Sequence, residues 1–116
     1  MAIQKFEDMI AWQKAQDLAF DIYQGFGDCR DYGFRDQLLR AAVSVSNNLA
    51  EGFERGSRID FKRFVFISKG SVSEIKSMLY LAQRLGYLHA DKSRKLMEQT
   101  DEIRRILSGL ITSLAK

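Results

Sequence analysis

The chain has 116 residues, of which 46% are hydrophobic and 28% charged, a composition that suits one folded domain and excludes a disordered chain. A single cysteine, Cys29, and a single histidine, His89, exclude an internal disulfide and a Cys/His metal site. The net charge is +3, but the charged residues are unevenly distributed along the chain. Residues 1–36 carry four Lys/Arg and seven Asp/Glu, whereas residues 37–116 carry fourteen Lys/Arg and eight Asp/Glu. This asymmetry permits an acidic partner such as nucleic acid.

The absence of proline favours long, uninterrupted helices. The first ten residues mix charges with short apolar pieces, unlike a signal peptide, and no uncharged apolar run is long enough to span a bilayer. We therefore expect one all-α domain over residues 1–116, located in the cytoplasm and without a membrane partner.

The first predicted helix runs from about Glu7 to Phe26, with Glu7 and Asp8 at its start, where the helix dipole favours anions. A polar turn, DCRDYG, is expected to close at Gly33. The core-facing residues recur at helical spacing, with Trp12 at the edge of the stripe: Ala15, Leu18, Ala19, Ile22 and Phe26.

The second predicted helix lies within residues 37–57, QLLRAAVSVSNNLAEGFERGS, and carries two stripes. The apolar stripe consists of Leu38, Leu39, Ala42, Val45, Leu49 and Phe53. The opposite, polar stripe consists of Arg40, Ser44, Asn48, Glu51 and Arg55. The polar stripe is either solvated surface or a second contact surface. Its short side chains, with Ala41 and Gly52 beside them, favour a contact surface.

The third predicted helix follows Gly56, with Ser57 as its N-cap, and ends at Gly86. Its core stripe consists of Phe61, Phe64, Val65, Ser68, Val72, Ile75, Leu79 and Ala82. A second seam consists of Phe66, Gly70, Ser73, Ser77, Tyr80 and Leu81. A glycine inside a helix costs about 1 kcal/mol relative to alanine, and close helix approach is the usual compensation. Gly70 therefore predicts a packing point rather than a phosphate-binding loop.

The fourth predicted helix runs from about Lys92 to Leu114, with Asp91 as a plausible N-cap. Its apolar positions repeat as a bundle heptad: Leu96, Thr100, Ile103, Leu107, Leu110 and Leu114. Four such segments joined by short turns predict an antiparallel up-down-up-down four-helix bundle.

Signals for catalysis are weak. His89 has no candidate partner for a nucleophile–base pair, and no Glu-x-x-His pair of the kind that holds two irons is present. GFGDCRDYG lacks the lysine and the preceding strand of a phosphate-binding loop. The residues therefore predict no enzyme, no cofactor and no metal.

A basic cluster around the turn between the second and third helices is the stronger signal: Arg55, Arg58, Lys62, Arg63 and Lys69. Phenylalanines are interleaved with these residues, as in proteins that bind nucleic acid through phosphate contacts and stacking. The alternative is a solvated basic face, since Glu51, Glu54 and Asp60 dilute the charge. In a homo-oligomer the patches of several copies would add together.

Three stretches carry a family resemblance: FEDMIAWQKAQDLAFDIY, RAAVSVSNNLAEGFERGS and FKRFVFISKGSVSEIKSMLYLAQRLGYL. Over roughly residues 6–110 they resemble the four-helix-bundle proteins encoded in intervening sequences of bacterial large-subunit rRNA genes. This ribosomal-protein-like family is related to the accessory variability proteins of retroelements. The resemblance implies a homo-oligomer, a pentameric ring, and a nucleic-acid partner.

The family's characteristic stretch falls on Arg40, Ser44, Asn48, Glu51, Gly52, Arg55, Gly70, Ser71 and Glu74, and it implies no catalytic role for them. The chain departs from the family at Ser46, where proline is frequent. That difference would relax a kink in the second helix.

Together these observations predict a non-enzymatic homo-oligomeric bundle that binds structured RNA through the five basic residues. The predicted oligomer interface consists of Ser44, Asn48, Glu51, Phe66, Gly70, Ser73 and Ser77. A scaffold that binds a protein instead of nucleic acid is the alternative. An RNA-processing enzyme ranks third, because it would need carboxylates that the sequence does not bring together.

Overall fold

Four long helices make up most of residues 3–115, the part of the chain that the computed structural model describes. They are α1 (Ile10–Phe26), α2 (Tyr32–Glu54), α3 (Arg58–Arg84) and α4 (Ala90–Leu114). A short 3-10 turn, η1 (Phe6–Asp8), precedes α1.

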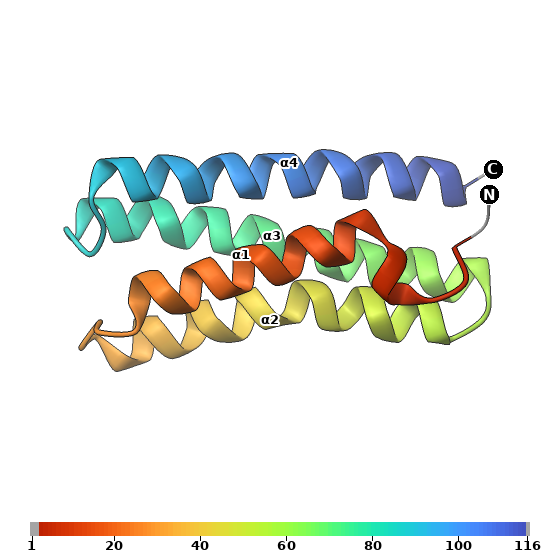
Figure 1. The fold of residues 1–116 in the computed structure, drawn as a ribbon, viewed down its shortest axis with the longest axis horizontal. Helices are drawn as coiled ribbons and strands as arrows, with labels where there is room; N and C mark the ends of the chain where they lie inside the picture. Colours follow the sequence, from red (N-terminus) through yellow and green to blue (C-terminus); the bar gives the residue numbers. More distant parts are fainter. Residues whose placement is uncertain (1–2, 116) are drawn as a thin grey trace.

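Consecutive helices run antiparallel, so that the connections lie at alternate ends of the bundle and both termini lie at one end (Figure 1). Helix α1 packs on α2 and α4, and α3 packs on the same two neighbours, which places α1 and α3 at diagonal corners. The bundle measures 43 × 21 × 19 Å, its long axis set by α3 at about 1.5 Å per residue. The predicted up-down-up-down four-helix bundle is confirmed.

One face of each helix forms the core. Every residue of the stripe predicted for α1 is buried, and in α2 the stripe is buried except for the half-buried Leu39 and Phe53. The stripe of α3 is buried apart from the half-buried Phe61. In α4 the stripe is buried as far as Leu107 and becomes half-buried towards the C-terminus. Helical periodicity alone therefore located the core.

The predicted starts of the first two helices are wrong. Helix α1 begins at Ile10, because Met9 adopts extended backbone angles that separate the helix from η1, which holds Glu7 and Asp8. Helix α2 begins at Tyr32 rather than after Gly33, because the Asp31 carboxylate accepts a hydrogen bond from the backbone N–H of Phe34 and caps the helix.

The ends of α3 follow the prediction and the start of α4 does not. Ser57 Oγ accepts a hydrogen bond from the Asp60 backbone N–H (3.1 Å), and Gly86 adopts a positive φ of 76° just after α3. In α4 the N-cap position is His89, whose side chain makes no capping hydrogen bond, and Asp91 already lies in the first turn. Helix α2 continues through Ser46 without a break.

Candidate nucleic-acid interface and self-association surfaces

The polar stripe of α2 faces α3 within the same chain. Asn48 Nδ2 donates to the backbone carbonyl (2.8 Å) and the hydroxyl (2.9 Å) of Ser44, and the Ser44 hydroxyl shares a hydrogen bond with that of Ser71 in α3 (2.9 Å). Ser44 and Asn48 are consequently half-buried, whereas Glu51, one turn further on, is exposed. Part of the predicted contact surface is therefore used inside the chain.

Helices α2 and α3 are in tight contact at Gly52. A Cβ atom placed on Gly52 would lie 2.5 Å from Phe64 Cβ, a distance that real side chains do not tolerate. Gly70 is different, because a Cβ atom there would meet nothing within 4 Å. Within the chain, Gly52 and not Gly70 is the packing point, because Gly70 lies on the outer side of α3.

Arg55 and Arg63 lie on the α2 side of α3 and share one aromatic ring. Their guanidinium carbons lie 5.0 and 5.5 Å from the centre of the Phe64 ring. Each also pairs with a carboxylate on the preceding turn: Arg55 Nη2 lies 2.9 Å from Glu51 Oε2, and Arg63 Nη2 lies 3.3 Å from Asp60 Oδ1. These two members of the predicted RNA-binding set are thus partly neutralised.

Arg58, Lys62 and Lys69 lie on the opposite flank of α3, towards α4. Arg58 Nη2 donates to the backbone carbonyl of Ser113 near the C-terminal end of α4 (3.0 Å). Lys62 and Lys69 follow Arg58 by four and eleven residues, which keeps them on this flank, and their side chains are half-buried. Neither lysine forms an ion pair with any carboxylate in residues 3–115.

Further basic residues extend this flank towards the middle of α4. Lys76 Nζ donates to Asp101 Oδ1 (2.7 Å), and this hydrogen bond lowers the pKa of Asp101 below its ordinary value although desolvation opposes the shift. The positive charges of Lys76, Arg104 and Arg105 lower that pKa further. Arg104 and Arg105 are absent from the predicted set, although their positions three and four residues after Asp101 place them beside it on a helix.

The outer side of α3 separates the two groups of basic residues. Phe66, Gly70, Ser73 and Ser77 are all exposed there, and Phe66 retains 51% of its accessible surface. The five predicted RNA-binding residues therefore do not form one patch. Three lie on the α4 flank, two lie on the α2 flank, and most of the predicted interface lies between them.

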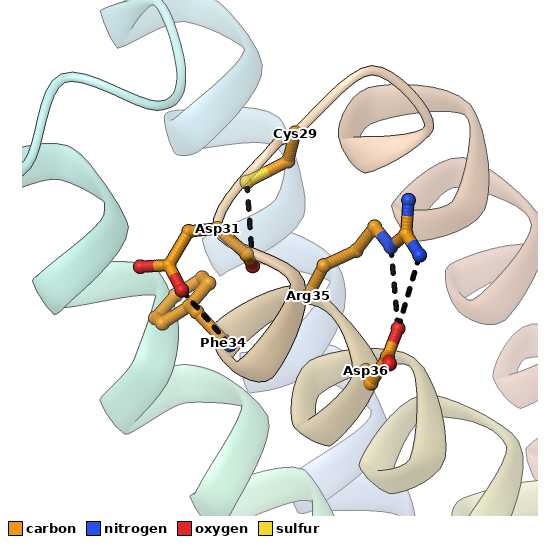
Figure 2. Close-up of polar contacts among 5 residues, drawn as sticks. All are labelled: Cys29, Asp31, Phe34, Arg35 and Asp36. Atoms are coloured by element: carbon orange, nitrogen blue, oxygen red, sulfur yellow. Dashed lines mark hydrogen bonds and ion pairs between the residues drawn. The ribbon is translucent and has the colours of Figure 1, made fainter.

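The end of the bundle that holds Cys29 is tied together by polar contacts. Figure 2 shows the Asp31 carboxylate beside the start of α2, the Cys29 thiol directed at the Asp31 carbonyl (4.0 Å), and Arg35 paired with Asp36 (3.2 Å). Tyr87, in the loop before α4, donates its hydroxyl proton to Asp31 Oδ2 (2.7 Å), and this hydrogen bond raises the pKa of Tyr87. These contacts join two loops and include no nucleophile–base pair.

Within residues 3–115, no three His, Cys, Asp or Glu side chains converge as ligands of a metal ion would. Over the same residues, none of the helices has both the length and the apolar character that crossing a membrane requires.

Comparison with known proteins identifies the family. Residues 7–109 match the 23S rRNA-intervening sequence protein family. A solved structure of a protein of unknown function from the S23 ribosomal protein family of Bacteroides thetaiotaomicron is similar, with a TM-score of 0.82 and 23% sequence identity over 88% of this chain and 98% of that one. That likeness confirms the fold. No curated protein matches the sequence. Because the family match covers nearly the whole bundle, the chain belongs to the 23S rRNA-intervening sequence protein family.

Proposed function

We propose that the protein is a non-enzymatic homo-oligomer, a pentameric ring, that binds structured RNA by contacts to phosphate groups. The basic strip along the seam between α3 and α4 carries the proposal. This strip comprises Arg58, Lys62, Lys69, Lys76, Arg104 and Arg105, and the carboxylate held among them is that of Asp101. Within this strip, Lys62 and Lys69 form no ion pair with a carboxylate in residues 3–115 and can therefore contact phosphates.

A strip of this kind suits backbone recognition rather than base readout. Lysine and arginine contacts to phosphates position a protein on nucleic acid without reading its sequence. Double-stranded RNA offers such a surface, because its deep major groove hides the base edges from side chains. Arg55 and Arg63 are secondary contributors, since each would first have to leave the carboxylate with which it pairs.

Self-association is the second part of the proposal. The outer side of α3 supports it, because Phe66 and Tyr80 are 51% and 57% exposed on the side of the helix that faces away from the core. A ring would bring several basic strips into one particle, and phosphate affinity rises with the number of charges that are neutralised. Light scattering tests this part directly, because a monomer at micromolar concentration would contradict it.

RNA binding is tested by measuring how the affinity for RNA depends on salt concentration in two variants that lose the same amount of positive charge. Lys62→Ala/Lys69→Ala removes two residues of the strip, whereas Arg30→Ala/Arg40→Ala removes two basic residues that lie outside it. We expect wild-type affinity for a labelled RNA hairpin to fall steeply with salt. The lysine variant should bind more weakly, and the slope of log K against log salt should flatten by about 1 for each lost phosphate contact.

The control variant should keep most of the affinity and the slope. Binding that ignores salt and is equal in both variants would contradict the RNA proposal and favour a scaffold for a protein partner. Cleavage of the hairpin by the purified protein would contradict its non-enzymatic part.

A further inference from the structure

We propose that the copies associate head to tail, with the outer side of α3 in one copy packed against the outer surface of α1 and α2 in the next. The inference rests on the self-association proposed above and names the two surfaces that meet. The first, the α3 stripe, consists of Phe66, Gly70, Ser73, Ser77 and Tyr80. The second, the α1–α2 face, consists of Phe20, Tyr23, Tyr32, Val43 and Ala50.

The α1–α2 face is a continuous surface across two adjacent helices. Gln16 marks the α2 side of α1, because its Nε2 donates to Ser46 Oγ in α2 (2.9 Å). Phe20 and Tyr23 follow Gln16 by four and seven residues and lie on the same side of α1. Val43 and Ala50 flank Ser46 at three and four residues on the facing side of α2. Figure 1 shows α1 and α2 side by side along their length.

Both surfaces expose large apolar side chains, although the Arg35 guanidinium lies over one face of the Tyr32 ring, 4.9 Å from its centre. Phe20 and Tyr32 are 64% and 58% exposed, comparable with Phe66 and Tyr80 on the α3 stripe. Exposed helix faces normally carry long charged residues, but the outer side of α1 carries glutamines beside Phe20, and the α3 stripe carries serines and glycine. Contiguous apolar surface of this kind marks an interaction site.

The shapes of the two surfaces complement each other. In the α3 stripe, the small residues Gly70, Ser73 and Ser77 lie between the aromatic residues Phe66 and Tyr80, and a Cβ atom on Gly70 would meet nothing within 4 Å. The α1–α2 face instead projects the large rings of Phe20 and Tyr23. Large side chains on one helix fit between the small ones of another when helices pack.

The charges around the two surfaces are opposite in balance, although each surface also borders one residue of the other sign: Glu74 beside the α3 stripe, and Arg35, which pairs with Asp36, beside Tyr32 on the α1–α2 face. Lys62, Lys69 and Arg84 border the α3 stripe, and none of them pairs with a carboxylate in residues 3–115. Asp17 and Glu54 border the α1–α2 face, and within the same residues neither pairs with a basic side chain. Opposed charges at the rims of two surfaces favour their association and fix its register.

The same charges disfavour the simplest alternative, a two-fold dimer of α3 stripes. A parallel dimer would set Lys62 and Lys69 of one copy beside the same residues of the other, and an antiparallel dimer would set Lys62 beside Arg84. Like charges across an interface are costly in both cases. The two proposed surfaces lie on different sides of one bundle, because α1 and α3 occupy diagonal corners. Each copy therefore uses one surface for each neighbour, and the assembly closes into a ring where the rotation permits.

Two variants, each with one damaged surface, test the inference. Ser77→Glu places a carboxylate in the α3 stripe, opposite the acidic rim, and leaves the α1–α2 face intact. Phe20→Glu removes the largest projection of the α1–α2 face and leaves the α3 stripe intact. Both positions are exposed, so each variant should keep the wild-type helical content by circular dichroism.

We expect each variant alone to sediment as a monomer of 13.3 kDa, and a mixture of the two to form a complex of one copy each and nothing larger. Only head-to-tail contact predicts this result, because the two intact surfaces then belong to different chains. If wild type assembles but Phe20→Glu alone still forms the wild-type oligomer, or the mixture forms no complex, the inference is wrong while self-association stands. A monomeric wild type would instead overturn the proposed self-association, and this inference with it.

Discussion

Gly52 is the residue that sets the distance between α2 and α3. Because a Cβ atom at this position would lie 2.5 Å from Phe64 Cβ and 3.1 Å from Phe64 Cγ, Gly52→Ala should force the helices apart. We expect a loss of about 1–3 kcal/mol in the free energy of unfolding, as for other overpacked cores. This loss should appear although alanine has a helix propensity about 1 kcal/mol better than glycine. Urea unfolding monitored by circular dichroism measures it.

Gly109 provides the matched control for Gly52. It lies inside α4, it is exposed, and a Cβ atom there would meet nothing within 4 Å. Gly109→Ala should therefore stabilise the protein by about 0.5–1 kcal/mol through helix propensity alone. If both substitutions stabilise the protein, α2 and α3 are not in tight contact at Gly52.

The N-cap position of α4 is not used to stabilise the helix. His89 has the extended backbone angles of an N-cap residue (φ −67°, ψ 152°), but its side chain accepts no hydrogen bond from the first turn. His89→Asp should add a capping hydrogen bond and a favourable charge at the helix N-terminus, and so stabilise the protein by about 1 kcal/mol. Thermal unfolding and slower amide exchange in the first turn of α4 would show the effect.

His89→Ala is the control for the capping prediction, because it removes the imidazole without supplying an acceptor. Its midpoint temperature should stay close to that of the wild type. An Asp variant no more stable than the Ala variant would mean that α4 does not begin at Ala90.

Periodicity in the sequence was enough to predict the helices and their core faces, but not the partner of each outer face. Leu96, Ile103 and Leu107 repeat so regularly that only a buried heptad explains them, and all three are buried. Gly52 and Gly70 look alike in the sequence, since each is a small residue within a helix. Only the three-dimensional packing distinguishes the glycine that contacts Phe64 from the one that lies in the open.

The basic residues that are close in the sequence lie on two flanks of α3 for a related reason. Arg58, Lys62 and Arg63 are close in the sequence, but a helix turns about 100° per residue and sends Arg63 to the α2 flank. Arg55 and Arg63 form ion pairs with Glu51 and Asp60. The sequence indicated that these carboxylates reduce the positive charge of the region, but not which basic residues they pair with. Arg104 and Arg105 are distant in the sequence and join the strip through the packing of α3 on α4.

Charge is unequally distributed between the two diagonal helices α1 and α3. Helix α3 carries six Lys/Arg and two Asp/Glu, whereas α1 carries one and two, and the two helices lie at diagonal corners. In a head-to-tail assembly the α1–α2 face of each copy would cover the α3 stripe of its neighbour. Most of the strip between α3 and α4 would stay open beside the contact, and the two surfaces overlap only at Lys62 and Lys69, which belong to the strip and also border the α3 stripe.

This arrangement predicts that RNA affinity depends on assembly even when every charge is kept. Phe20→Ala removes the main projection of the α1–α2 face and changes no charged residue. It lies on α1, diagonal to α3, which carries four of the six residues of the basic strip. We expect this variant to dissociate the oligomer and to bind the RNA hairpin more weakly. The slope of log K against log salt should fall towards that of a single protomer, because fewer phosphates are neutralised per particle. Fluorescence anisotropy across a salt series measures both quantities, with sedimentation of the same samples reporting the assembly state. A monomeric Phe20→Ala protein that bound the hairpin with the wild-type affinity and salt slope would show that one bundle carries the whole RNA site, and that the ring adds nothing to it.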